Sequence, residues 1–592
     1  MKFLHSVLAL FLLAVQGTVL AQDQPLLQLK YEENYTPTYD EAIEMYRLLD
    51  EKYENASLIE EGKTDVGKPL HLFIINNKPE FGPEKIRQEG KSVLLINNGI
   101  HPGEPEGIDA SLQFADDILR NKNGMQKWLE NTVVVIIPVY NIGGHLNRSA
   151  FNRSNQTTPY ETGFRGNARN LDLNRDFTKC DSENARSMNK IFTKWNPDVF
   201  LDTHTTNGSD HQYSITWVTP FPDYFPPTQE KFLREKMIPQ VFEMMDKGEY
   251  KLIPYVDWIF NDPLAGIQIF PDAPRYSSGY ASLFNSYGMM TENHVYKDFP
   301  DRVKSVYQFM AVLAEFTAAN SAEIMKSREK GLQETLELES YAIDYTIDTT
   351  EYRMIDFAGY ETSDKIIDKA TGLPRFGYDR SKPFSTKIKY YDVYNVSEKI
   401  TIPEYYVLPQ GWWEVVERLH LNGVEMISLK NDTILQVEVD YIDEFSSPKQ
   451  PYNGHYFHNE VKTHSEIQEI QYHAGDVIVP VRQEKIKYIL EMLEPKAMDS
   501  FFRWNFFDSA LDQREYFSSY GFEENALKYL NEHPDFKKQL DEKQAADPEF
   551  AKNHRAQLAF IYNNTEWAEK TWKRYPVGKI FEKARFWLTP SF

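Results

Sequence analysis

The first half of the chain repeats short apolar runs that are separated by longer stretches with a helical spacing of apolar residues. The apolar runs occupy residues 70–75, 93–96, 133–137, 199–201 and 288–291. The stretches with helical spacing occupy residues 38–50, 108–119, 185–195 and 302–319. The runs predict buried strands, and the spaced stretches predict helices with one buried face. Buried strands that alternate with helices predict an α/β domain, in which helices cover a mixed, largely parallel sheet.

After about residue 321 the pattern changes. A charged helical stretch at residues 323–339 leads into aromatic-rich segments in which apolar and polar residues alternate. These segments predict strands and occupy residues 386–391, 435–441 and 476–481, with a short helical pattern at 412–419. From residue 485 helical patterns dominate again, for example at 485–493 and 525–530. We therefore predict an α/β domain at 22–322, a helical linker at 323–340, a β-rich accessory domain at 341–484 and a helical C-terminal region at 485–592.

The first 21 residues have the pattern of a secretory signal peptide. Lys2 is followed by a largely apolar stretch at residues 3–20, and V-L-A at 19–21 offers small residues for cleavage before Gln22. An uncleaved membrane anchor is the alternative, but no stop-transfer pattern follows. No later segment approaches the ~20 apolar residues that a spanning helix needs. We therefore expect an exported protein, periplasmic or extracellular, without a membrane span.

The net charge limits the kinds of binding partner, and the cysteine content limits how the fold is stabilised. The 592 residues include 65 lysines and arginines and 88 aspartates and glutamates, which gives a formal charge of −23 spread along the chain. Such a balance argues against nucleic acid and anionic membranes as partners. The single cysteine, Cys180, excludes an intramolecular disulfide, so the fold must rely on its core. We expect Cys180 to serve packing.

Three residues suited to binding a metal follow two of the predicted strands. His101 and Glu104 lie in N-N-G-I-H-P-G-E at residues 97–104, and His204 ends F-L-D-T-H after the run at 199–201. The carboxyl ends of strands in an α/β sheet form one edge, where sites assemble. Two imidazoles and a carboxylate suit a catalytic zinc with one open position. The alternative is a set of polar loop residues without a metal.

Further polar residues fall near the same predicted edge. Residues 165–177 contain Arg165, Arg169 and Arg175 with Asn174, a combination that suits a carboxylate held bidentately. A salt-bridged loop is the alternative for these arginines. Glu292 follows the run at 288–291 and suits a general base, with an exposed loop glutamate as the alternative.

Taken in order, four motifs resemble those of the zinc carboxypeptidases of the carboxypeptidase A type. They are H-P-G-E, N-A-R-N-L-D-L-N-R-D-F, D-T-H-T and T-E-N, and the resemblance covers about residues 38–320. It implies that His101, Glu104 and His204 hold one zinc ion. It also implies that Asp172 orients His101 from behind.

The resemblance implies roles for the remaining residues as well. Arg165 would polarise the scissile carbonyl, Asn174 and Arg175 would hold the C-terminal carboxylate of the substrate, and Glu292 would be the general acid/base that helps a zinc-bound water attack. Arg169 could take the place of Arg165. A tyrosine usually closes over the substrate in this family, and the candidates are Tyr276, Tyr280 and Tyr287.

The leading hypothesis is therefore an exported zinc metallocarboxypeptidase whose substrate is a peptide with a free C-terminus. A zinc amidase acting on cell-wall peptides would use the same residues. A non-catalytic peptide-binding protein on the same fold is a third hypothesis, which the presence of all three ligand candidates and Glu292 disfavours. A second metal site is less favoured than separate surface histidines at His455, His458, His464 and His473.

Overall fold

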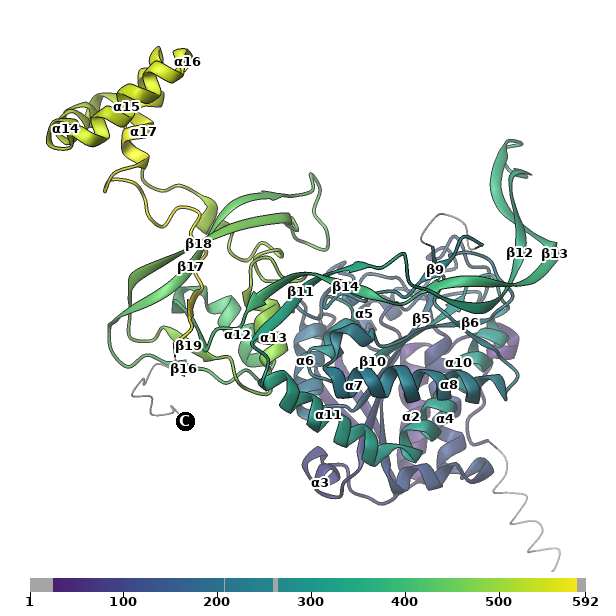
Figure 1. The fold of residues 1–592 in the computed structure, drawn as a ribbon. Coiled ribbons are helices and arrows are strands. Elements are labelled where there is room, and N and C mark those ends of the chain that lie inside the picture. Colours follow the sequence, from purple (N-terminus) through teal and green to yellow (C-terminus); the bar gives the residue numbers. More distant parts are fainter. Residues whose placement is uncertain (1–24, 207, 259–263, 583–592) are drawn as a thin grey trace, which may run out of the picture.

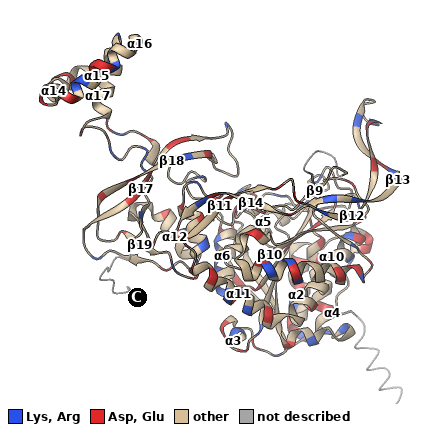
Figure 2. Cartoon of the chain, viewed as in Figure 1, with Lys and Arg blue, Asp and Glu red and all other residues tan. Residues whose placement is uncertain are grey.

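A computed structural model describes residues 25–206, 208–258 and 264–582 (Figure 1). The predicted signal peptide at residues 1–21 lies outside these ranges. Within them, no helix combines the length and the apolar character needed to cross a bilayer. Acidic and basic residues are interspersed along the helices and strands (Figure 2).

An eight-stranded sheet forms the centre of the first region. Its strands, in spatial order, are β1 (Ala56–Lys63), β2 (Pro69–Ile75), β4 (Thr132–Ile137), β3 (Ser92–Asn97), β5 (Val199–Thr206), β10 (Tyr287–His294), β6 (Ile215–Val218) and β7 (Leu252–Pro254). The four central strands, from β4 to β10, are parallel to one another. Antiparallel pairs join β1 to β2, β2 to β4 and β6 to β10. The predicted mixed, largely parallel sheet is confirmed.

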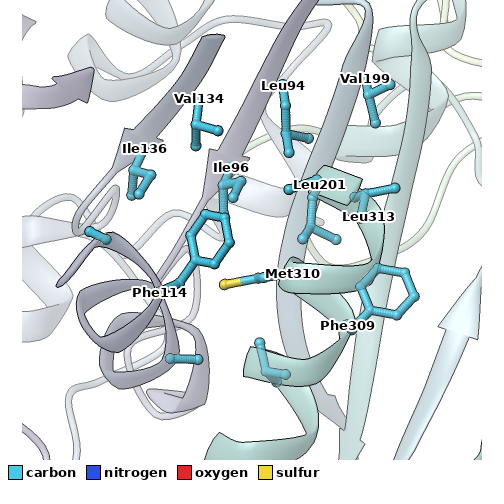
Figure 3. Packing of buried hydrophobic residues seen from close by; sticks show 14 of the residues in the cluster. Leu94, Ile96, Phe114, Val134, Ile136, Val199, Leu201, Phe309, Met310 and Leu313 are labelled. Carbon is cyan, nitrogen blue, oxygen red and sulfur yellow. The ribbon is translucent and has the colours of Figure 1, made fainter. Parts of the chain in front are cut away.

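Alternate residues of the central strands pack into two cores, one on each face of the sheet. Leu94 and Ile96 of β3 join the core on one face, together with Phe114 and Met310 from helices (Figure 3). Val93 and Leu95 of the same strand join the core on the opposite face. A strand buried on both faces needs apolar residues at every position, which explains the continuous apolar runs in the sequence.

Helices cover both faces of the sheet. The helices of the first region are α2 (Tyr39–Lys52), α3 (Pro83–Gln88), α4 (Glu106–Leu119), α5 (Ile142–Leu146), α6 (Glu183–Trp195), α7 (Pro227–Phe232), α8 (Ile238–Asp246), α9 (Ser277–Ser282), α10 (Phe299–Ala319) and α11 (Ser321–Leu336). Helices α2, α4 and α10 pack in the first core, and α6 and α9 pack in the second. Helix α2 begins with a capping box between Thr38 and Glu41, which fixes its start.

A mixed four-stranded sheet, an antiparallel six-stranded sheet and an antiparallel strand pair complete the β structure, as expected for a β-rich region. The pair is β11 (Ser340–Ile347) with β14 (Tyr394–Thr401), and the long hairpin of β12 (Arg353–Ile367) and β13 (Pro374–Tyr391) adds to β9 (Ile267–Gln268) and β8 (Asp257–Trp258). The six-stranded sheet has the order β16 (Ile427–Ser428), β19 (Val477–Pro480), β15 (Tyr405–Leu408), β20 (Gly578–Ile580), β17 (Thr433–Ser446) and β18 (Asn459–Tyr472). Strand β20 therefore returns the C-terminal tail to this sheet.

The remaining helices divide between the shared core and a separate bundle. They are α12 (Trp413–Leu421), α13 (Ile486–Leu493), α14 (Ser519–Glu532), α15 (Pro534–Ala546), α16 (Pro548–Ala551) and α17 (His554–Asn563). Helices α12 and α13 pack in the second core beside strands of the first region. Helices α14 to α17 enclose a small core of their own and stand apart from the rest of the chain (Figure 1).

Short 3-10 and π segments complete the fold. They are η1 (Tyr31–Glu33), η2 (Lys122–Glu130), η3 (Leu173–Arg175), η4 (Pro222–Tyr224), η5 (Leu233–Met237), η6 (Gln410–Trp412) and η7 (Asp508–Leu511). Segment η3 bears on the site, because it places Asn174 and Arg175 beside the end of the central sheet.

Candidate metal centre and active site

Two of the predicted ligands lie in the turn between β3 and α4, and the third lies on β5. The turn needs Gly99 in the left-handed region, at φ 68°. It carries His101 and Glu104 to the carboxyl edge of the sheet. His204 belongs to β5 itself, because that strand runs on to Thr206 and pairs with β10 along its whole length. His204 therefore lies within the strand, close to its carboxyl end.

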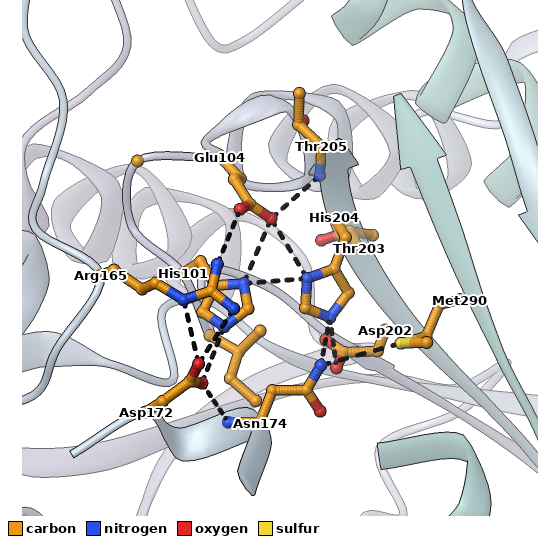
Figure 4. A network of polar contacts seen from close by, with 12 residues as sticks. His101, Glu104, Arg165, Asp172, Asn174, Asp202, Thr203, His204, Thr205 and Met290 are labelled. Carbon is orange, nitrogen blue, oxygen red and sulfur yellow. Dashed lines mark hydrogen bonds and ion pairs between the residues drawn. The ribbon is translucent and has the colours of Figure 1, made fainter. Parts of the chain in front are cut away.

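Figure 4 shows the three side chains pointing toward one another. His101 Nδ1 lies 3.3 Å from Glu104 Oε2 and 3.2 Å from His204 Nδ1, and His204 Nδ1 lies 3.1 Å from Glu104 Oε2. Tetrahedral zinc with ligands at about 2.0–2.2 Å separates its ligands by about 3.3–3.6 Å. The donor set and its spacing therefore fit a zinc ion. Among the described residues no other group of histidines, cysteines and carboxylates has such an arrangement.

Each histidine is oriented from behind by a carboxylate. His101 Nε2 lies 2.9 Å from Asp172 Oδ1, and His204 Nε2 lies 3.0 Å from Asp202 Oδ2. A carboxylate in this position holds the proton on Nε2 and leaves the lone pair of Nδ1 directed at the metal position. Burial raises the pKa of Asp172, but His101 and Arg165 hold it well below the usual range.

Sequence reasoning found Asp172 but missed Asp202. The signal for Asp202 was present, because residues two apart on a strand point to the same face of a sheet. The side chains of Asp202 and His204 therefore lie on the same face of the sheet, close enough for a hydrogen bond.

Glu104 is held as a carboxylate by two further contacts. Its Oε1 accepts a hydrogen bond from Arg153 Nη1 at 3.0 Å, and its Oε2 accepts one from the backbone N–H of Thr205 at 2.9 Å. Burial raises the pKa of Glu104, but His101 and Arg153 lower it to well below the usual range. Arg153 was not identified from the sequence, because it lies in an irregular loop with no periodic pattern.

Glu292 stands beside the ligands on the neighbouring strand. In the parallel pairing of β10 with β5 it is level with His204, so both side chains point to the same face. Burial raises the pKa of Glu292 to about 8, and His204 opposes this shift. As with His204, the strand continues past Glu292, to His294.

The ligands and Glu292 open into one pocket of about 350 Å³. The polar residues of its wall are His101, Glu104, Asn152, Arg153, Ser154, Asn155, Arg165, Asn174, Arg175, His204, Thr205, Thr206 and Glu292. Its apolar and aromatic residues are Val218, Tyr255, Phe270, Tyr276 and Met290. Every predicted site residue except Arg169 and Asp172 therefore lines this pocket, and Asp172 lies directly behind it.

Arg169 is placed outside the pocket, so its predicted role as a substrate-binding residue or as a substitute for Arg165 does not fit. Its side chain is exposed and donates to the carbonyl oxygen of Asp181 at 2.7 Å. Arg165, by contrast, donates from Nε to Asp172 Oδ2 at 2.9 Å, and its Nη1 lies 3.5 Å from Glu104 Oε1.

The three candidate tyrosines also separate. Tyr276 lines the pocket, with its ring centroid 4.2 Å from Cζ of Arg175. Tyr280 and Tyr287 are fully buried in the cores, and their hydroxyl groups bond to Asn422 and Ser327.

The other residues singled out from the sequence have structural partners. Cys180 is buried, and burial raises the pKa of its thiol to about 12, which suits packing. The four histidines pair with four different carboxylates: His455 with Asp181, His458 with Asp508, His464 with Asp443 and His473 with Asp432. They form no common cluster within the described ranges.

Comparison with known proteins points to one family. Residues 43–222 match the family model described as zinc carboxypeptidase. The chain is 21% identical over 441 residues to "Carboxypeptidase 2" of Trichophyton rubrum, with 69% of this chain and 72% of that protein covered. It is 21% identical over 430 residues to "Carboxypeptidase 2" of Trichophyton tonsurans, with the same coverage.

Solved structures give similar matches. A carboxypeptidase A from Helicoverpa armigera matches with a TM-score of 0.38 and 15% identity, covering 50% of this chain and 75% of that one. A metallo-carboxypeptidase from Pseudomonas aeruginosa in complex with (2-guanidinoethylmercapto)succinic acid matches with a TM-score of 0.37 and 14% identity, covering 49% of this chain and 70% of that one.

Proposed function

Because the chain belongs to the zinc carboxypeptidase family and is a metallocarboxypeptidase, we propose that it hydrolyses the last peptide bond of peptides with a free C-terminal carboxylate. One observation supports this most directly. The cluster of His101, Glu104 and His204, the carboxylate of Glu292 and the guanidinium of Arg175 all line the same pocket. A metal site, a base and a carboxylate-binding group are thus within reach of one substrate.

The three ligands would hold the zinc ion. When bound, zinc would act as a Lewis acid and lower the pKa of water at the open position. Asp172 and Asp202 keep both histidines in the tautomer that a metal requires. Arg153 keeps Glu104 ionised, so that the ligand set carries one negative charge.

Glu292 acts as the general base and acid in this proposal. It accepts a proton from the water that attacks the carbonyl carbon and then donates that proton to the leaving amine. Burial raises its pKa to about 8. A cation held by the neighbouring ligands favours the carboxylate form and brings this pKa down toward neutrality, where both transfers are feasible.

Arginines supply the other charges that the reaction needs. Arg165 lies beside Glu104 and Asp172 at the pocket wall, where its guanidinium can stabilise the developing oxyanion. Arg175 and Asn174 hold the substrate carboxylate, and this contact restricts cleavage to the terminal bond. Tyr276, which stacks on Arg175 at the pocket, covers the bound residue.

The N-terminal pattern supports the further proposal that the protein is exported to the periplasm or the extracellular space. The measurement is the N-terminal sequence of the protein recovered outside the cytoplasm. A mature chain that begins at Gln22 is expected, and retention of residues 1–21 in a cytoplasmic protein would contradict export.

Mass spectrometry of digests tests the activity. The mature protein is incubated with mixed peptides and with purified cell-wall peptides, each with and without a zinc chelator. Stepwise loss of C-terminal residues that the chelator stops is expected. Cleavage of wall peptides alone would indicate a cell-wall amidase. Zinc binding without any cleavage would indicate a non-catalytic peptide-binding protein.

The Glu292→Gln variant tests the role of the base. It is expected to bind zinc as the wild type does, while its turnover rate falls about 10²–10⁴-fold. Glu315→Gln, on the exposed side of α10, is the matched control and keeps full activity. Retained turnover in Glu292→Gln would assign the proton transfers to another carboxylate.

A further inference from the structure

A loop of the β-rich region reaches the arginine that the proposed function assigns to the substrate carboxylate. The loop connects β17 to β18, and it contacts the first region at three successive points. Tyr452 Oη accepts a hydrogen bond from Arg175 Nε at 2.8 Å, and Asn453 Oδ1 accepts one from the backbone N–H of Asp172 at 3.3 Å. His455 Nε2 lies 2.7 Å from Asp181 Oδ2.

From these contacts we propose that Tyr452 is a positioning residue for Arg175, and that the β-rich region thereby completes the carboxylate-binding part of the pocket. The inference rests on the proposed function, since it concerns how Arg175 is prepared for a C-terminal carboxylate. Tyr452 does not line the pocket itself, so its effect on a bound carboxylate would pass through Arg175.

The tip of the loop is a tight turn that fixes where Tyr452 lies. Tyr452 and His455 exchange two backbone hydrogen bonds, at 2.7 and 3.1 Å. Asn453 and Gly454 between them both have positive φ, at 50° and 85°. An Asn-Gly pair with two positive φ angles is typical of a type I′ turn, a favoured two-residue connection in hairpins.

The ring of Tyr452 is held on its faces. It lies nearly parallel to the buried ring of Trp504, with centroids 5.9 Å apart and an interplanar angle of 11°. The guanidinium of Arg275 lies 5.9 Å from the centroid of Tyr452. With the backbone and the ring both fixed, the hydroxyl group is directed at Arg175 Nε.

The contact determines which edge of Arg175 is free. Tyr452 takes the Nε–H, and the carbonyl oxygen of Asn174 accepts from Nη1 at 2.7 Å. Within the described part of the chain no hydrogen bond uses Nη2. A planar guanidinium fixed at these two atoms presents its Nη1–Nη2 edge for a bidentate pair with a carboxylate. Ordering the arginine before the substrate arrives removes part of the entropic cost of binding.

The Tyr452→Phe variant of the full chain tests this role. Phenylalanine keeps the ring on Trp504 and removes only the hydroxyl group. For an N-acylated dipeptide with a free carboxylate, KM is expected to rise about tenfold, as for the loss of a hydrogen bond to a charged group, with kcat within about twofold of the wild type. For the C-terminal amide of the same dipeptide, kinetics or inhibition are expected to stay unchanged.

Tyr456→Phe is the matched control, because Tyr456 lies in the same loop with an exposed side chain. It is expected to behave as the wild type with both dipeptides. Thermal unfolding of both variants verifies that the fold is retained. An equal change for the acid and the amide, or no change for the acid, would overturn the inference.

A double-mutant cycle separates this inference from the proposed function. Arg175→Lys keeps the positive charge but has no Nε–H, so Tyr452→Phe is expected to add nothing in that background. A further tenfold loss there would show that Tyr452 does not act through Arg175. If Arg175→Lys weakens the acid and the amide equally, the assignment of Arg175 to the carboxylate fails, whatever Tyr452 does.

Discussion

Replacing Asp202 by asparagine changes the charge behind the cluster of His101, Glu104 and His204 and almost nothing else. Asp202 is fully buried, and its two oxygens accept from His204 Nε2 at 3.0 Å and from Asn97 Nδ2 at 3.0 Å. Asparagine can keep the first bond through its carbonyl oxygen. Its amide group then faces Asn97, whose own Oδ1 has no partner in the described structure and can accept after a flip of the Asn97 amide. The substitution is therefore expected to preserve the fold.

The expected effect is a weaker hold on zinc. Burial lowers the pKa of His204, and Asp202 and then Glu104 raise it well above its usual value. The charge of Asp202 thus supports the basicity of this ring more than any other neighbour does. Loss of such a partner typically lowers metal affinity 10–100-fold, which corresponds to about 1.4–2.7 kcal/mol.

The assay is competition for zinc between the metal-free protein and a chromophoric chelator. Asp443→Asn is the matched control, because Asp443 pairs with His464 at 2.8 Å on the surface and has no metal ligand as partner. We expect Asp202→Asn to lose affinity and Asp443→Asn to keep it. Zinc affinity of Asp202→Asn within twofold of the wild type would refute the reasoning.

Two further predictions concern stability. Burial raises the pKa of Glu491 to about 8. Because this folded-state pKa exceeds the unfolded one, the contribution of protonated Glu491 to the free energy of unfolding is complete below about pH 4.5 and is lost as the pH rises through 8. Glu491→Gln is therefore expected to unfold like the wild type at pH 4 and to be about 2–5 kcal/mol more stable at pH 9, and equal unfolding midpoints at pH 9 would contradict this. Gly107→Ala would place a Cβ 2.0 Å from Thr203 Oγ1 and push α4 away from β5, so the free energy of unfolding in urea is expected to fall by about 1–3 kcal/mol. Gly411→Ala is the control and is expected to leave stability unchanged, because its Cβ would meet no atom within 4 Å.

The central sheet was predictable because strands buried on both faces appear in the sequence as unbroken runs of apolar residues. Strands β3 and β4 are buried at every position, and helices α4 and α6 have one wide apolar face. Strand β1 has no such apolar run. It lies at the edge of the sheet, is only partly buried beyond its first residue and carries E-E-G-K at its end, so its pairing with β2 is a tertiary effect.

The long hairpin was only partly predictable for the same reason. Of β13, only the buried end near Tyr391 was expected, because its other residues and most of β12 are exposed. Without a buried face, neither strand shows a regular alternation of apolar and polar residues. The domain boundaries stay predictions, since the second core contains residues from both sides of residue 340.

The metal cluster was predictable because topology alone brings the ends of parallel strands together. The turn after β3 and the end of β5 are adjacent in register, with Asn97 opposite Asp202, so His101 and His204 meet there. Arg153 and Tyr452 could not be found in this way. Arg153 reaches Glu104 from an irregular loop, and Tyr452 reaches Arg175 across 277 positions of the chain. Neither position follows from local pattern.

Part of the second half of the chain packs directly against elements that carry the site. Tyr280 of α9 donates to Asn422 beside α12, and the ring of Phe284 stacks on Tyr488 of α13 with centroids 5.8 Å apart. The first residue of α9, Ser277, donates its backbone N–H to Asn174 Oδ1. Helix α9 therefore joins a carboxylate-binding residue to the core of the second half. The loop carrying Tyr452 contacts the adjacent Arg175 directly, so residues beyond 340 reach Arg175 by a hydrogen bond and Asn174 only through α9.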